Sequence, residues 1–282
     1  LFSSLELAYV NLKARHNLNF TIGKQFVNFG GYEYYVNSIR VREFSEFNNL
    51  LTAYQAGISG NWQVNPDHEL CFQIVNNRNG NDEDIYPTGL PEGTAKAKIP
   101  FMYTVNWNSY YLDKTLQLRY ATAVGQQTRK RYSYYFTCGN TYEKGPLLTY
   151  LDVMYTRQGI DQHGVVSRLP GTPHTAMNTE YLSIIGDVDY RVHPQWNVYV
   201  KGAYETARVY KGNGDFRKGM YRRSWNAQSS VEFFPFKQLD LFVFVLYTYR
   251  GVILEKAATR MGAIEPDTHR ISLGLVYSIP VF

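Results

Sequence analysis

The stretch MYRRSWNAQSSVEF, from Met220 to Phe233, alternates apolar and polar side chains with a period of two. Its apolar face carries Tyr221, Trp225, Ala227, Val231 and Phe233, and its polar face carries Arg222, Ser224, Asn226, Gln228, Ser230 and Glu232. Successive side chains of a β-strand point to opposite faces, so the pattern predicts a strand with one apolar and one wet face. Such a strand is typical of a transmembrane β-barrel, whose outer face contacts lipid and whose inner face contacts water.

About thirteen stretches of this kind follow one another, joined by links that are mostly short and long in turn. We expect strands over residues 3–12, 17–26, 50–63, 69–77, 101–110, 116–125, 132–142, 147–156, 181–192, 196–209, 220–234, 239–249 and 269–282. The regular difference between links, and strands of roughly ten residues or more, argue against the alternatives of a soluble β-sandwich or propeller.

The sequence therefore predicts an all-β, antiparallel, up-and-down transmembrane β-barrel that occupies residues 1–282 as a single domain. Short turns of outer-membrane barrels face the periplasm and long loops face outside, so the first and last strands both descend. An even-stranded barrel then needs an odd number of strands before Leu1, giving about 14 or 16 in all. We expect those N-terminal strands to be missing from this sequence, and we expect the protein in the outer membrane of a Gram-negative bacterium.

Composition argues against several other classes of protein. Tyr (25) and Phe (16) are frequent while only 19% of residues are charged, a bias that strand formers and interfacial aromatic residues produce. No run approaches the ~20 apolar residues of a spanning helix. The net charge of +5 is dispersed, so we expect no nucleic-acid partner. Because the histidines are not placed beside a serine nucleophile and metal-ligand spacing is absent, we expect no enzyme, cofactor or metal site.

Charged side chains on the polar faces would line a lumen and act on permeating ions at close range. The residues that the alternation places inward, and that we expect to line the pore, are Arg119, Arg191, Lys201, Arg222, Arg270, Glu205, Glu232 and Asp187. Bases and acids are nearly balanced, which favours a general diffusion pore over a strict anion selector. The alternative for any one of them is a pairing across neighbouring strands that stiffens the wall.

The link over residues 28–49 is the candidate for a constriction, because its aromatic residues can be buried against the inner wall. Within it we expect Tyr32, Glu33, Arg40 and Arg42 at the narrowest point, where the two arginines supply positive charge. The alternative is an extracellular surface loop.

Five segments carry a resemblance to a known family: IGKQFVNFGGYE (22–33), NSI (37–39), FSEF (44–47), YQAGIS (54–59) and LCFQIVN (70–76). They resemble Bacteroidota outer-membrane porins related to the phosphate-selective porin O and P family. The resemblance implies a barrel of 16 strands, a homotrimer, passage of small hydrophilic solutes, and at least one extracellular loop folded into the pore. The anion path of that family uses arginine and lysine ladders, and none of those positions is assigned to a residue of this sequence.

We therefore expect a water-filled channel, surrounded by outer-membrane lipid, for passive diffusion of small hydrophilic solutes and ions, with at most a mild preference for anions. The alternative is a plugged barrel that acts as an adhesion, structural or partner-binding scaffold. Its long loops, residues 78–98 and 157–178, would then supply the binding surface.

Overall fold

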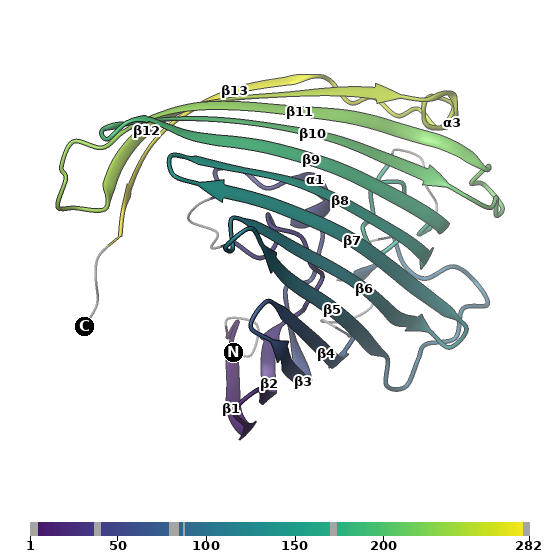
Figure 1. Ribbon diagram of the computed structural model, residues 1–282. Coiled ribbons are helices and arrows are strands. Elements are labelled where there is room, and N and C mark those ends of the chain that lie inside the picture. The colour runs from purple at the N-terminus through teal and green to yellow at the C-terminus, as the bar shows by residue number, and fades with distance from the viewer. Residues whose placement is uncertain (1–4, 37–40, 79–84, 87, 170–173, 279–282) are drawn as a thin grey trace.

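The strands form a single antiparallel sheet in which each pairs with its neighbours along the chain (Figure 1). The computed structural model describes residues 5–36, 41–78, 85–86, 88–169 and 174–278. Its 13 strands are β1 (Ala8–Arg15), β2 (Leu18–Phe26), β3 (Tyr54–Asn65), β4 (His68–Asn76), β5 (Phe101–Tyr111), β6 (Leu116–Thr128), β7 (Arg131–Lys144), β8 (Leu147–Ile160), β9 (Met177–His193), β10 (Trp196–Val209), β11 (Gly219–Phe233), β12 (Leu241–Leu254) and β13 (Thr268–Tyr277). The predicted all-β, antiparallel, up-and-down fold is confirmed.

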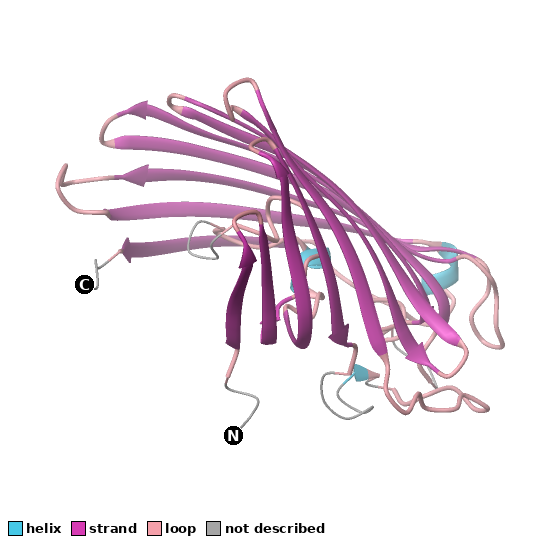
Figure 2. Cartoon of the chain, turned by 60° about the horizontal axis from the view of Figure 1, so that its bottom comes forward, coloured by secondary structure: helices cyan, strands magenta, loops and turns pink. Residues whose placement is uncertain are grey.

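The sheet curls into a trough, with β1 and β13 as its edges (Figures 1 and 2). The short helix α1 (Glu46–Asn49) belongs to the link between β2 and β3 and lies on the concave side of the trough. A second short helix, α3 (Lys256–Thr259), lies in the link between β12 and β13. The described residues include no helix that is long and apolar enough to cross a membrane.

The two faces of the sheet have the opposite polarity to those of a soluble protein. Along β5, Tyr103 is 53% exposed and Val105 40% exposed on the convex side, whereas Thr104 is 2% exposed and Asn106 6% exposed on the concave side. The same alternation recurs along β10, where Val200 is 52% exposed and Lys201 is 1% exposed. Polar groups lie inside and large apolar groups lie outside, as expected when hydrocarbon is the outer solvent.

The main apolar cluster lies between the concave face and the link of residues 27–53, which we call the inserted segment. Phe29 packs its ring against Tyr34 and Tyr135, with ring centroids 5.5 Å and 4.9 Å apart. Tyr32 packs against Tyr150 at 4.8 Å. The inserted segment contributes Val27, Phe29, Tyr34 and Phe47 to this cluster, and the wall strands and other links supply the rest of it.

Several strands run farther than predicted toward the end that carries the long links. The strand predicted over residues 147–156 continues to Ile160, and the one predicted from residue 181 begins at Met177. At Ile160 the backbone N–H donates to the side-chain oxygen of Gln127 at 2.9 Å, and the Gln127 amide donates back to the Ile160 carbonyl at 2.6 Å. The strand expected over residues 116–125 continues to Thr128 and the one expected from residue 132 begins at Arg131, so only Arg129 and Lys130 remain in the turn between β6 and β7.

We predict that Val105→Arg destabilises the folded protein in lipid bilayers by about 2–4 kcal/mol, because it places a charge in the middle of the lipid-facing side of β5. The measurement is the free energy of unfolding in liposomes, obtained from denaturant titrations. Val105→Leu at the same site should stay close to the parent protein. Equal stability of the Arg and Leu variants would mean that this face does not contact hydrocarbon.

Candidate functional site

The inserted segment enters the trough at Gly30 and Gly31, which have φ of 74° and 79°. This left-handed backbone favours glycine. A Cβ on Gly30 would lie 2.7 Å from the Cβ of Ala121 on β6. On β7, a Cβ on Gly139 would lie 2.6 Å from the Cα of Gly31. The backbone of the inserted segment therefore lies directly on the wall, and the Gly31 N–H donates to the Arg119 carbonyl at 3.2 Å.

A buried carboxylate on β8 holds the next two residues. Asp152 is 0% exposed, and its Oδ2 accepts the backbone N–H groups of Tyr32 at 2.8 Å and Glu33 at 2.9 Å. Hydrogen bonds from backbone N–H to a charged carboxylate are among the stronger ones in proteins. Asp152 therefore acts as an anchor for the inserted segment.

Glu33 and Lys201 form a buried ion pair between the inserted segment and β10, with side chains 0% and 1% exposed. Glu33 also accepts the N–H and hydroxyl of Ser45, at 3.0 Å and 2.6 Å, and a bond from the Asn48 amide. The Lys201 ammonium donates in addition to the Glu43 carbonyl at 2.7 Å. The sequence predicted Lys201 as a pore-lining residue and Glu33 at a constriction, and the structure buries the two side chains against each other inside the trough.

The start of helix α1 is bound by another predicted inward residue. Glu205 accepts the backbone N–H of Phe47 at 2.9 Å and that of Glu46 at 3.2 Å, and the hydroxyl of Ser183 at 3.0 Å. Ser45 is the N-cap residue, and its hydroxyl accepts the Asn48 N–H at 3.4 Å. The wall thus satisfies the N–H groups that the first turn of a helix leaves without a partner.

Arginines on the wall bind acidic residues of the inserted segment. Arg222, which is 3% exposed, pairs with Glu46 and, at 2.7 Å, with Glu265 of the link after β12. Arg270 pairs with Glu43, and its side chain is 57% exposed because β13 is an edge strand. Both lie on the inner face where they were predicted, and both are paired.

One arginine of the inserted segment reaches the wall in the opposite direction. Arg42 pairs with Glu232 of β11, which also accepts the Asn197 amide at 3.1 Å, and Arg42 lies 4.0 Å from Asp189. The side chains of Arg42 and Glu232 are 8% and 1% exposed. The other predicted arginine of this link, Arg40, lies outside the described residues.

Two predicted arginines stack on aromatic rings. The guanidinium of Arg119 lies 3.9 Å from the ring centroid of Tyr35, and that of Arg191 lies 3.7 Å from the ring centroid of Phe234. Such contacts favour a cation on the face of the ring. Arg191, unlike Arg119, lines an open cavity.

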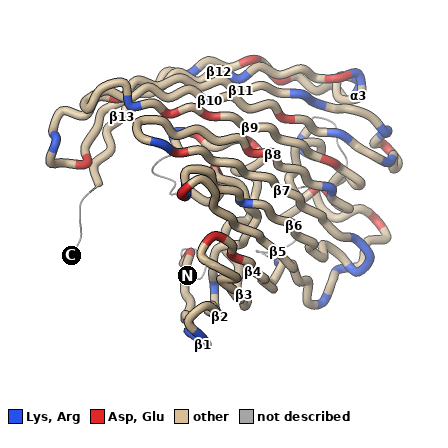
Figure 3. The backbone as a smooth tube through the Cα atoms, in the orientation of Figure 1, with Lys and Arg blue, Asp and Glu red and all other residues tan. Residues whose placement is uncertain are grey.

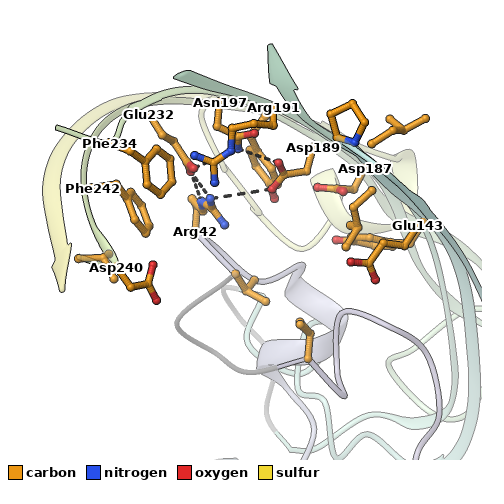
Figure 4. A pocket seen from close by; sticks show the side chains of 18 of the residues that line it. Arg42, Glu143, Asp187, Asp189, Arg191, Asn197, Glu232, Phe234, Asp240 and Phe242 are labelled. Carbon is orange, nitrogen blue, oxygen red and sulfur yellow. Dashed lines mark hydrogen bonds and ion pairs between the residues drawn. The ribbon is translucent and has the colours of Figure 1, made fainter. Parts of the chain in front are cut away.

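This cavity of about 620 Å³ lies between the inserted segment and the wall, at the end that carries the short turns. Figure 4 shows Arg42 below Glu232, with Asp187, Asp189 and Glu143 along the adjacent wall. The charged residues that line the cavity are Arg42, Arg191, Glu143, Asp187, Asp189, Glu232 and Asp240. Acidic groups therefore outnumber basic groups in the cavity. Among all the charged residues that the sequence placed on the inner face, acids and bases are nearly balanced.

A second link also enters the trough, which the sequence did not indicate. In the link between β8 and β9, Asp161 is 0% exposed and accepts the N–H groups of Gly164 and Ser167, each at 2.9 Å. His163 packs between Phe47 and Tyr181, at 5.0 Å from each ring. Burial lowers the pKa of His163 to about 3. No cluster of His, Cys, Asp or Glu suited to a metal ion occurs in the described part of the chain.

Comparison with known proteins gives a match to one family model. The model described as phosphate-selective porin O and P matches residues 2–279. No curated protein matches the chain.

Solved structures of outer-membrane channels share the fold. OmpT of Vibrio cholerae is 11% identical, with a TM-score of 0.58, covering 96% of this chain and 80% of OmpT. The outer-membrane channel DcaP of Acinetobacter baumannii is 11% identical, with a TM-score of 0.59, covering 92% of this chain and 71% of DcaP. An anion-selective porin from Comamonas acidovorans is also 11% identical, with a TM-score of 0.59. The match covers 95% of this chain and 76% of the Comamonas porin.

We predict that Lys201→Ala destabilises the protein by about 3–5 kcal/mol, because it leaves the Glu33 carboxylate buried without its cation. The double variant Glu33→Gln with Lys201→Met should recover part of that loss. Lys130→Ala, in the exposed turn between β6 and β7, serves as the control. The free energy of unfolding of each variant gives the result, and a loss no larger than that of the control would contradict a buried ion pair.

We also predict a pH dependence from His163. Its folded pKa of about 3 lies below the ordinary value of 6.5, so the unfolded chain takes up a proton that the folded chain excludes. The stability contributed by the neutral ring is complete above about pH 6.5 and decreases as the pH falls toward 3. His163→Leu should flatten this dependence in unfolding measured across that range. Parallel curves for parent and variant would show that His163 does not titrate in this way.

Proposed function

This chain belongs to the phosphate-selective porin O and P family, and on that basis we propose that it forms a water-filled channel in the outer membrane for passive diffusion of small hydrophilic solutes and ions. The family and the structural neighbours are porins of the Gram-negative outer membrane, which is therefore the location of this protein. Both point to a channel rather than to an enzyme.

The observation that carries the proposal is the polarity of the two faces together with the cavity. Charged side chains on the inner face of the sheet need water around them, because the outer face contacts lipid. The interior of the barrel must therefore hold water. The cavity of about 620 Å³ is lined by charged side chains of the wall and by Arg42 of the inserted segment. We infer that Arg42, Asp187, Arg191 and Glu232 border the path of permeating ions, and that the inserted segment narrows it.

We propose a mild preference for anions, because two regions of opposite charge lie in series. Basic residues gather in turns and links at the end that carries the long links, including the blue turn between β6 and β7 (Figure 3). They are Arg129, Lys130, Lys211, Arg217 and Lys218. A basic mouth raises the local concentration of anions. The acidic cavity at the other end opposes their passage, so the net selectivity is weak.

We further infer a homotrimer whose outer faces contact lipid. One of the structural neighbours is the trimer form of OmpT, with 12% identity and a TM-score of 0.54. The edge strands β1 and β13 each have one side whose backbone N–H and C=O groups pair with no other described strand. Hydrocarbon cannot hydrogen-bond these groups, so in the membrane other backbone groups must pair with both edges. The resemblance of residues 22–33 to Bacteroidota porins supports an origin in that group.

A plugged scaffold is the second candidate, and the two links that enter the trough favour it. The inserted segment and the link after β8 both bury side chains against the wall, among them Phe47 and His163. Swelling of proteoliposomes in small sugars separates the two functions. A channel admits the sugars, whereas a plugged barrel excludes them.

For the channel, we predict that single-channel recordings in asymmetric KCl give a small reversal potential with the sign of anion preference. Arg42→Ala should shift that potential toward cations, because it removes a positive charge and leaves Glu232 without its partner. Arg42→Lys keeps the charge and should stay closer to the parent. If the Ala and Lys variants both reproduce the parent conductance and reversal potential, Arg42 does not border the ion path.

A further inference from the structure

Asp187 on β9 is a largely buried carboxylate that forms no ion pair among the described residues, although it faces the cavity. It is 4% exposed, and within the described part of the chain neither of its carboxylate oxygens is placed to accept a hydrogen bond. The hydroxyl of Tyr199 lies close enough to interact with this carboxylate. A carboxylate that is largely buried, borders a cavity and forms no ion pair is stabilised by a ligand that supplies positive charge and hydrogen-bond donors.

The cation that could neutralise Asp187 is committed elsewhere. Lys201 lies directly opposite Asp187 in the pairing of β9 and β10, but its ammonium binds Glu33 and the Glu43 carbonyl of the inserted segment. Arg42 pairs with Glu232, and the guanidinium of Arg191 lies on the ring of Phe234. Each of these three cations thus makes its closest contact with another group.

Aromatic rings border the same part of the cavity. Tyr150 lies directly opposite Asp187 in the pairing of β8 and β9, and its ring packs against Tyr32 at 4.8 Å. Tyr199, opposite Asp189 on β10, also lines the cavity. A carboxylate beside aromatic faces is the combination that recognises an organic cation, because the ring faces attract positive charge and the carboxylate fixes its position.

The remaining charges of the cavity have the sign that such a ligand needs. Asp189, Glu143 and Asp240 line it together with Asp187 (Figure 4). Asp189 lies two residues from Asp187 on the same face of β9, and one of its oxygens accepts the Asn197 amide at 2.7 Å. A bare divalent cation prefers six or more oxygen ligands, whereas no group of residues suited to a metal ion occurs in the described part of the chain.

We propose that the cavity holds a binding site for a primary ammonium group of a small organic solute, with Asp187 as the counter-ion and Tyr150 as the adjacent ring. The inference rests on the proposed function, because it names a class of solute for the wetted interior of the channel. The ammonium donates to the carboxylate oxygens of Asp187 and sits against the ring face of Tyr150. The channel would then attract anions at its basic mouth and bind ammonium groups at its other end.

The test uses n-butylammonium chloride as the probe and the protein in planar bilayers, with the probe added to each side in turn. We expect a saturable reduction of the KCl current from the side that exposes the short turns. The uncharged analogue 1-butanol should have no such effect, and MgCl₂ at equal positive charge should act much more weakly. Equal reduction by MgCl₂ would show unspecific attraction to acidic groups and would overturn the site.

Two sets of variants locate the site. Asp187→Asn should raise the concentration of n-butylammonium that blocks half of the current about tenfold. This is the change expected when one charge-assisted hydrogen bond is lost. Asp113→Asn removes the same charge from an exposed turn outside the cavity and should leave the block unchanged. Tyr150→Phe keeps the ring and should keep the block, whereas Tyr150→Leu should weaken it. Unchanged block in both Asp187→Asn and Tyr150→Leu overturns the proposal.

The two proposals fail in different ways. A protein that conducts KCl but shows no saturable block by n-butylammonium is a channel without this site. If the protein does not conduct, isothermal titration of n-butylammonium into the folded protein in detergent still decides the question. Binding that Asp187→Asn weakens about tenfold supports the site independently of conduction, and absence of binding to the parent protein overturns it.

Discussion

The structure depends on the pairing of backbone N–H and C=O groups between neighbouring strands, because hydrocarbon offers them no other partner. Each strand from β1 to β13 pairs with its chain neighbours, so between the two edge strands the ladder satisfies the backbone groups of the lipid-facing wall. Because the backbone pairs as β-strands, successive side chains point to opposite faces. The outer face contacts lipid and is apolar, whereas the inner face contacts water and is polar. Val105 outside and Asn106 inside are neighbours in sequence for this reason.

A polar inner wall cannot hold an inserted segment by apolar contact alone, and the anchors are accordingly carboxylates. Asp152 and Glu205 of the wall each accept two backbone N–H groups from the inserted segment, and Asp161 accepts two within its own link. The ion pair of Glu33 with Lys201 adds a contact that is removed from water. Many of the charges on the inner face therefore serve to position the links, and only a part of them faces open space.

This division of roles determines the electrostatics of the interior. Once Lys201 and Arg222 are bound to acidic residues of the links, the balance of bases and acids along the wall no longer describes what a solute meets. The cavity beside Asp187 and Asp189 is acidic, whereas the links at the opposite end carry Arg129, Lys130 and Lys211. Weak overall selectivity and local recognition of a charged group are compatible in such a channel, because they arise at different depths.

The sequence by itself determined the strands, their number and their two faces, since a period of two is a local property that each strand carries in its own residues. It also placed Arg119, Lys201 and Arg222 on the inner face and singled out the link with Tyr32 and Glu33. Only the tertiary structure decided which inward charges are covered, that Asp152 is an anchor, that Asp161 and His163 enter the trough, and that Asp187 forms no ion pair with any described residue. Those outcomes depend on contacts between residues more than a hundred positions apart, such as Tyr32 with Asp152 and Glu33 with Lys201, and no local pattern encodes such contacts.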